Sequence, residues 1–152
     1  MNRNNSQRNA NKQCNFTDIL FHQINLAKRK LAMFNLALST SNKPFVDLIQ
    51  DQHLLKNNKP SNFDKRHQIL YSRTERPSAA IFALKDIPLW FNCELIDNDV
   101  ATSLWITKDN NNPKIMLVSC YWDIFVEKPP KKLEKAVLHA KRHNYSLWIG
   151  MD

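Results

Sequence analysis

The segment most informative about the fold is Ser146-Leu147-Trp148-Ile149-Gly150-Met151-Asp152, with which the sequence ends. Its apolar centre has strand propensity and follows a helical segment, which predicts a strand that carries Asp152 at its carboxyl end. In open α/β sheets the carboxyl ends of strands face the ligand crevice, so a carboxylate there can act on a substrate. Gly150 is the only glycine of the chain. Because it has no Cβ, it allows backbone or ligand to come close beside the aspartate.

A strand, a helix and a strand are also predicted near the beginning of the chain. Asp18–Asn25 is apolar enough for a strand buried on both faces, and Phe45–Gln50 is a second strand that leads into Asp51. A helix is predicted from Leu26. Its apolar stripe consists of Ala27, Leu31, Phe34 and Leu38. Such a βαβ unit has parallel strands.

Further strands and a second helix are predicted in the rest of the chain. Residues 55–77 are predicted to be a long surface loop with a short strand at Gln68–Tyr71. Three further strands are predicted at Ala79–Leu84, Val100–Thr107 and Lys114–Tyr121, the last two joined by a hairpin turn at Asp109–Pro113. A helix that opens at Pro129-Pro130 and buries Leu133, Ala136, Val137 and Ala140 leads to the final strand. The fold class is therefore α/β, with a mixed sheet and flanking helices.

Composition limits the class of protein. The 152 residues fit one domain, and the net charge of +8 favours partners that carry phosphate. Met1–Asn15 has almost nothing to bury and is predicted to be a disordered basic tail, which leaves residues 16–152 as the domain. The three cysteines include no CxxC pair, so neither a disulfide framework nor a zinc knuckle is indicated. No membrane span or secretory signal is found, which predicts an intracellular protein, nuclear or cytoplasmic, that is not secreted.

Four polar residues stand where a predicted strand gives way to a loop: Asn25, Asp51, Tyr121 and Asp152. We call them the strand-end residues. If their strands are parallel neighbours, they converge and offer oxygen ligands for a hard cation and donors for a phosphate. The alternative is that the Asn and Asp residues serve turns and the tyrosine serves packing.

Three other patterns have simpler explanations. His139 and His143 have a spacing that can hold zinc, but Ala-Lys-Arg stands between them, so a solvated helix face is the preferred interpretation. Basic clusters such as Lys28–Lys30 and Lys141-Arg142 are typical of helix surfaces, although they can also follow a phosphate backbone. The four tryptophans lie in or beside strand-like runs, so most are predicted to be core.

The order of these features resembles a known family. The segments that carry the resemblance are Gln-Ile-Asn ending at Asn25, Asp-Leu-Ile-Gln-Asp ending at Asp51, Ala79–Phe82, Val-Ser-Cys-Tyr ending at Tyr121, Pro129–Lys135 and Leu147–Asp152. Together they resemble the endonuclease/exonuclease/phosphatase family, and more narrowly the apurinic-type endonuclease of non-LTR retrotransposons. The resemblance runs from about Phe16 to Asp152. It implies an incomplete two-sheet α/β sandwich (DNase I-like) and a Mg²⁺-dependent cut in DNA that primes reverse transcription.

The resemblance also implies a role for each strand-end residue. Asn25 would orient the scissile phosphate and the metal, and Asp51 would stand at the position of the metal-binding glutamate. Tyr121 would contact the phosphate, and Asp152 would orient or activate the attacking water.

The chain departs from the family pattern in two respects. Asp51 is one methylene shorter than the family glutamate, and the residues that complete the family's catalytic centre beyond Asp152 have no counterpart here. We therefore expect a truncated domain without activity, whose inner sheet face is exposed for lack of the other half of the sandwich. A non-catalytic basic remnant that binds nucleic acid weakly, or has no role, is the alternative. A phosphoinositide or sphingolipid substrate is a further one.

Overall fold

A computed structural model describes residues 19–38, 44–57, 59–60, 65–73, 76–106 and 114–152. Its elements, in chain order, are β1 (Leu20–Asn25), α1 (Lys30–Leu38), β2 (Phe45–Gln50), β3 (His67–Tyr71), β4 (Ala79–Leu84), β5 (Leu89–Phe91), the 3-10 helix η2 (Cys93–Leu95), β6 (Val100–Trp105), β7 (Ile115–Cys120), α2 (Lys131–Arg142) and β8 (Ser146–Met151). The predicted strands and both predicted helices are present within these residues. The predicted tail and the turn at Asp109–Pro113 lie outside the described residues.

The strands form two four-stranded sheets, in the orders β1-β2-β4-β3 and β5-β6-β7-β8. β1 pairs with β2 in parallel, and β7 pairs with β8 in parallel. The other pairs are antiparallel. Both predicted β-α-β crossovers and the mixed character of the sheets are therefore confirmed.

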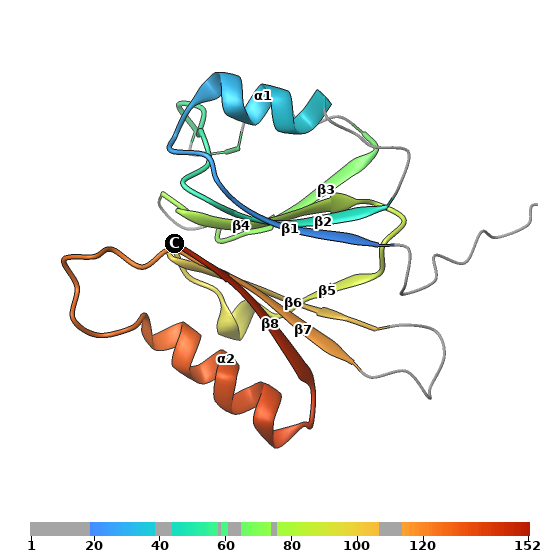
Figure 1. The fold of residues 1–152 in the computed structure, drawn as a ribbon, viewed down its shortest axis with the longest axis vertical. Helices are drawn as coiled ribbons and strands as arrows, with labels where there is room; N and C mark the ends of the chain where they lie inside the picture. Colours follow the sequence, from blue (N-terminus) through green and yellow to red (C-terminus); the bar gives the residue numbers. More distant parts are fainter. Residues whose placement is uncertain (1–18, 39–43, 58, 61–64, 74–75, 107–113) are drawn as a thin grey trace, which may run out of the picture.

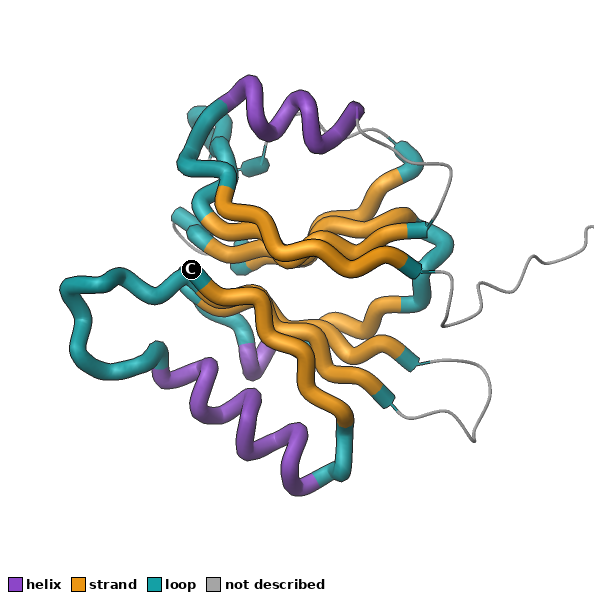
Figure 2. Tube along the Cα trace, viewed as in Figure 1, coloured by secondary structure: helices purple, strands orange, loops and turns teal. Residues whose placement is uncertain are grey.

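The two sheets lie face to face, with one helix on each outside (Figure 1). α1 covers the first sheet and α2 covers the second, which gives the four layers seen in Figure 2. Side chains from both sheets form the central core, among them the fully buried Val46, Ile81 and Leu117. The expected exposed inner face is thus wrong, because β5 to β8 supply a second sheet that covers it. None of the helices among the described residues has the length and apolarity of a membrane span.

The expectation that β1 is buried on both faces is also wrong. β1 lies at the edge of its sheet, and Leu20, His22, Gln23 and Asn25 are exposed. An edge strand has a neighbour on one side only, so an apolar sequence does not ensure its burial.

The first helix begins at Lys30 and not at Leu26, because Ala27 and Lys28 adopt left-handed backbone conformations with φ of 47° and 55°. The predicted stripe is incorrect as well. Leu31 is 69% exposed, whereas Met33 is buried against Phe45 and Phe82. Apolar residues run almost continuously through this helix, so periodicity alone did not identify its buried face.

In α2, Leu133, Ala136 and Ala140 are buried as predicted, but Val137 is 39% exposed. The tryptophans are less buried than expected. Trp105 alone of the four is buried, whereas Trp90 is 64% exposed.

Candidate active site

Strand parity places Asn25 and Asp152 opposite each other. Phe21, Gln23 and Asn25 alternate along β1 on the face that meets the second sheet, where Phe21 packs edge-on against Trp148 with ring centroids 4.5 Å apart. Trp148, Gly150 and Asp152 have the same alternation along β8. The Asn25 Nδ2 group donates a hydrogen bond to Asp152 Oδ2. Two edge strands from different sheets thus join their carboxyl ends at this pair.

The remaining contacts of the pair determine its orientation. Asn25 Oδ1 accepts a hydrogen bond from the Ala27 amide at 2.7 Å, so the Nδ2 group points to the carboxylate. The Asp152 amide donates to the Cys120 carbonyl at 3.2 Å, and the Asp152 carbonyl accepts from the Trp122 amide at 2.9 Å. Asp152 therefore continues the β7–β8 pairing beside Tyr121.

Asp51 follows β2 in a left-handed conformation with a φ of 49°, a region that Asp tolerates better than most residues. Its amide donates to the Ser78 carbonyl at 2.7 Å, and its carbonyl accepts from the Lys28 amide at 2.6 Å. The Lys28 ammonium lies 3.5 Å from Asp51 Oδ1. Among the described residues, this buried oxygen accepts no hydrogen bond. The Lys28 ammonium is the cationic partner that the described residues give to this oxygen.

The charges of both carboxylates, Asp51 and Asp152, affect the pKa of Tyr121. The negative charge of Asp51 is the largest cause of a raised pKa at its phenol, and burial, Asp123 and Asp152 add to the rise, while Lys28 opposes it. A phenol with a raised pKa keeps its proton at neutral pH and can donate a hydrogen bond. The structure thus brings all four strand-end residues into one neighbourhood.

A hard cation fits the oxygen donors of this neighbourhood, since Asp51 and Asp152 supply carboxylates. Within the described residues, however, no group of three or more His, Cys, Asp or Glu side chains comes together in a way that could hold a metal ion.

A buried polar network lies beneath the strand-end residues. The Gln50 Nε2 group donates to Ser119 Oγ at 2.8 Å and to the Gly150 carbonyl at 3.1 Å, and Ser119 Oγ donates to the Ile49 carbonyl at 2.8 Å. Gln23 Nε2 donates to the Met151 carbonyl at 2.8 Å. These bonds connect the two sheets directly below the site.

Sequence reasoning missed two contributors to the site. Lys28 was interpreted only as part of an exposed basic cluster, and Gln50 only as the end of a strand. The alternation of β2 contained a signal for Gln50, since it shares the inward face with Val46 and Leu48. Lys28 gave no comparable signal, because it reaches Asp51 through a turn that only the fold reveals.

The histidine pair lies away from this site. The His139 and His143 rings are 4.2 Å apart between centroids, and His143 Nδ1 lies 2.9 Å from the His139 carbonyl. Tyr145 stacks on His143. The pair lies on α2, where His143 is exposed and His139 is half-buried.

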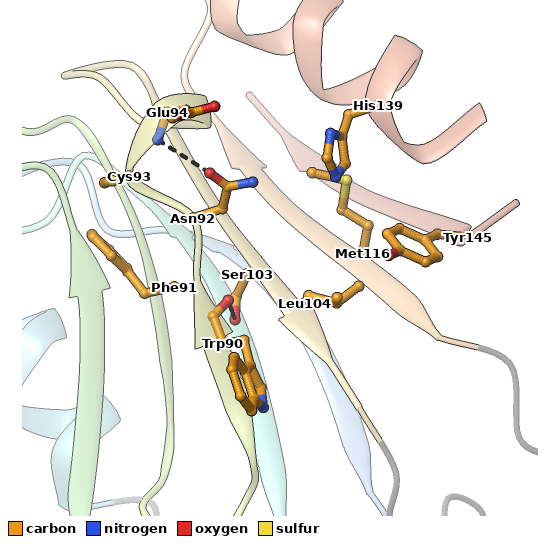
Figure 3. A pocket seen from close by; sticks show the side chains of 10 residues that line it. All are labelled: Trp90, Phe91, Asn92, Cys93, Glu94, Ser103, Leu104, Met116, His139 and Tyr145. Atoms are coloured by element: carbon orange, nitrogen blue, oxygen red, sulfur yellow. Dashed lines mark hydrogen bonds between the residues drawn. The ribbon is translucent and has the colours of Figure 1, made fainter. Parts of the chain in front are cut away.

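Two hollows elsewhere do not include the strand-end residues. One of about 320 Å³ lies on the outer side of the second sheet, where Trp90, Cys93 and His139 are among the side chains that line it (Figure 3). Another, of about 460 Å³, is lined by His22, Leu36 and Asp47 among others. The candidate site is therefore assigned from its chemistry and not from the size of a cavity.

The comparisons with known proteins support the fold. No protein-family model matches the chain, and none of the curated proteins matches it. The structure is similar to the solved endonuclease domain of TRAS1, a telomere-specific non-LTR retrotransposon, with a TM-score of 0.58 and 21% sequence identity. The match covers 88% of this chain and 57% of that domain, so the chain spans little more than half of its length. This likeness shows that the chain shares the two-sheet fold of that domain.

Proposed function

We propose that this chain carries part of the active site of a Mg²⁺-dependent DNA endonuclease of the non-LTR retrotransposon type, and that the chain by itself does not cut DNA. The observation that carries the proposal is the Asn25–Asp152 hydrogen bond, formed between two sheets beside Asp51 and Tyr121. The similarity to the TRAS1 domain, which is an endonuclease domain, gives this geometry its chemical context. A DNA substrate would also agree with the net charge of +8.

Each side chain has a role that its contacts allow. The Asp152 carboxylate, oriented by the Asn25 amide, would hold the attacking water in line with the phosphorus atom. The protonated Tyr121 phenol would donate to a phosphate oxygen. Asp51 would hold the Mg²⁺ ion. When bound, that ion polarises the phosphoryl oxygen and stabilises the leaving oxyanion.

The proposed lack of activity follows from the small number of catalytic groups. The Asp51 carboxylate is already paired with the Lys28 ammonium. Among the described residues, no group of three or more His, Cys, Asp or Glu side chains that could hold a metal ion comes together. Positioning a phosphate without the full set of charges gives only a small part of the transition-state stabilisation.

The first prediction tests this proposal by NMR and by plasmid nicking. Adding Mg²⁺ and a short DNA duplex should shift the Asn25 side-chain amide and the Asp152 backbone amide, and should leave those of α2 unchanged. Supercoiled plasmid with Mg²⁺ should show no nicking above buffer. Shifts that avoid Asn25 and Asp152 would refute the site. Nicking that vanishes in Asp152→Ala would instead keep the site and refute the inactivity.

The net charge of +8 also favours a second candidate, a non-catalytic remnant that binds nucleic acid through its basic surface. This candidate predicts DNA binding that Mg²⁺ does not strengthen and that is unchanged by Asp51→Asn or Asp152→Asn. The NMR titration, repeated with these variants, separates the two candidates.

A further inference from the structure

The turn between β1 and α1 directs Lys28 towards Asp51. Ala27 and Lys28 are consecutive non-glycine residues in the left-handed region, with φ of 47° and 55°, a combination that side chains disfavour. The turn is held by the bond from the Ala27 amide to Asn25 Oδ1 at 2.7 Å and by the bond from the Lys28 amide to the Asp51 carbonyl at 2.6 Å. Both bonds end on strand-end residues, so this conformation belongs to the site.

The ion pair that results is asymmetric. The Lys28 side chain is 69% exposed and that of Asp51 is 14% exposed, with 3.5 Å between the ammonium nitrogen and Asp51 Oδ1. An ion pair that is mostly exposed on one side contributes little to folding stability. Its main effect is on the charge of the pocket, since it places a positive charge at the carboxylate oxygen that accepts no hydrogen bond from the described residues.

We propose that Lys28 is a tethered counter-ion of Asp51 that competes with a divalent cation for this carboxylate and so keeps the metal affinity of the site low. The inference rests on the proposed function, because it assumes that Asp51 is a metal ligand. A divalent ion bound to Asp51 would lie within a few ångströms of the ammonium. Even in a water-like dielectric, the repulsion at about 5 Å weakens binding by about tenfold.

The experiment measures Mn²⁺ affinity by the electron paramagnetic resonance signal of the free ion, so that no catalysis is needed. The variant is Lys28→Met, which replaces the charged side chain by an uncharged, unbranched one that is one atom shorter. We expect it to bind Mn²⁺ about tenfold more tightly than the wild type. The matched control is Lys135→Met, an equal change of charge on the exposed face of α2, which should leave the affinity unchanged. Lys28→Gln should repeat the effect of Lys28→Met.

Asp51→Asn separates the failure of this inference from the failure of the proposed function. Asn tolerates the left-handed conformation of position 51, so the backbone is preserved. Tighter binding in Lys28→Met that is lost on adding Asp51→Asn supports the inference. Equal affinities in wild type and Lys28→Met, both lost with Asp51→Asn, overturn the role of Lys28 alone. Mn²⁺ binding that is absent throughout, or that ignores Asp51→Asn, overturns both proposals.

Discussion

Asp47 is an ionisable side chain buried inside the fold, where the charged form is unfavourable. It lies in the middle of β2, is 2% exposed, and has its Oδ1 2.8 Å from His22 Nδ1 on the neighbouring strand. Burial raises the pKa of Asp47, and the hydrogen bond from His22 and its charge oppose this rise without cancelling it. Ionisation of such a buried carboxyl group lowers the stability of the folded state.

The second prediction follows from that raised pKa. Above the ordinary value of 3.8 the native state of the wild type holds a proton at Asp47 that the unfolded chain has lost. The free energy of unfolding therefore falls as the pH rises from there through the folded pKa. Asp47→Asn lacks this titration. The free energy of unfolding of the wild type minus that of Asp47→Asn should thus decrease as the pH rises from 3.8 through the folded pKa of Asp47. Urea denaturation at a series of pH values measures this difference.

The exposed Asp86→Asn variant serves as the control for this experiment, since it removes an equal charge at the surface. A wild-type advantage over Asp47→Asn that stays constant or grows with pH would contradict the assignment.

At the scale of elements, β8 depends on its glycine. A Cβ built on Gly150 would lie 2.7 Å from Leu48 Cβ and 3.0 Å from Gln23 Cγ, both in the opposite sheet. The first of these atoms is attached to the backbone of β2 and cannot move without moving the strand. The close approach expected beside Asp152 is therefore confirmed, and what approaches is the other sheet.

The third prediction is that Gly150→Ala destabilises the chain by about 1–3 kcal/mol, the usual cost of overpacking. Ser146→Ala introduces the same residue in the same strand at an exposed position and should change stability by less than about 0.5 kcal/mol. Chemical denaturation of both variants measures the difference. Equal stabilities of Gly150→Ala and Ser146→Ala would show that a Cβ at position 150 does not clash with the opposite sheet.

At the scale of the whole molecule, a buried polar network holds the two sheets together. Gln50 and Ser119 come from β2 and β7, and both are fully buried between the sheets. A buried hydrogen bond of this kind has defined geometry, so it sets the register of one sheet on the other more closely than apolar contacts do. The strand-end residues lie directly above it and take their positions from that register.

The fourth prediction is energetic coupling between these two residues. Gln50→Leu and Ser119→Ala should each cost about 1–3 kcal/mol, and the double variant should cost less than the sum by at least about 0.5 kcal/mol. Gln68 bonds to the Leu84 and Ile87 carbonyls, on a different part of the molecule. The effects of Gln68→Leu and Ser119→Ala on the free energy of unfolding should therefore be additive. Additivity in the Gln50 cycle would show that the network does not hold the sheets.

From the sequence alone most of the elements and their local order could be predicted, but not β5 or η2. Alternation and helical periodicity were sufficient for both parallel crossovers, for the buried Leu133, Ala136 and Ala140 of α2, and for polar residues at the strand ends. These features depend on residues close in the chain, so a local pattern encodes them.

Contacts between residues far apart in the chain follow from the packing of the two sheets and could not be predicted. Asn25 and Asp152 are separated by 127 positions, and Gln50 and Gly150 by 100. The buried face of α1, the exposed edge position of β1 and the pairing of Lys28 with Asp51 likewise depend on how one sheet, its helix and its turns pack. Periodicity predicts which face of a strand is buried. It does not predict which element packs against that face, because the partner comes from elsewhere in the chain.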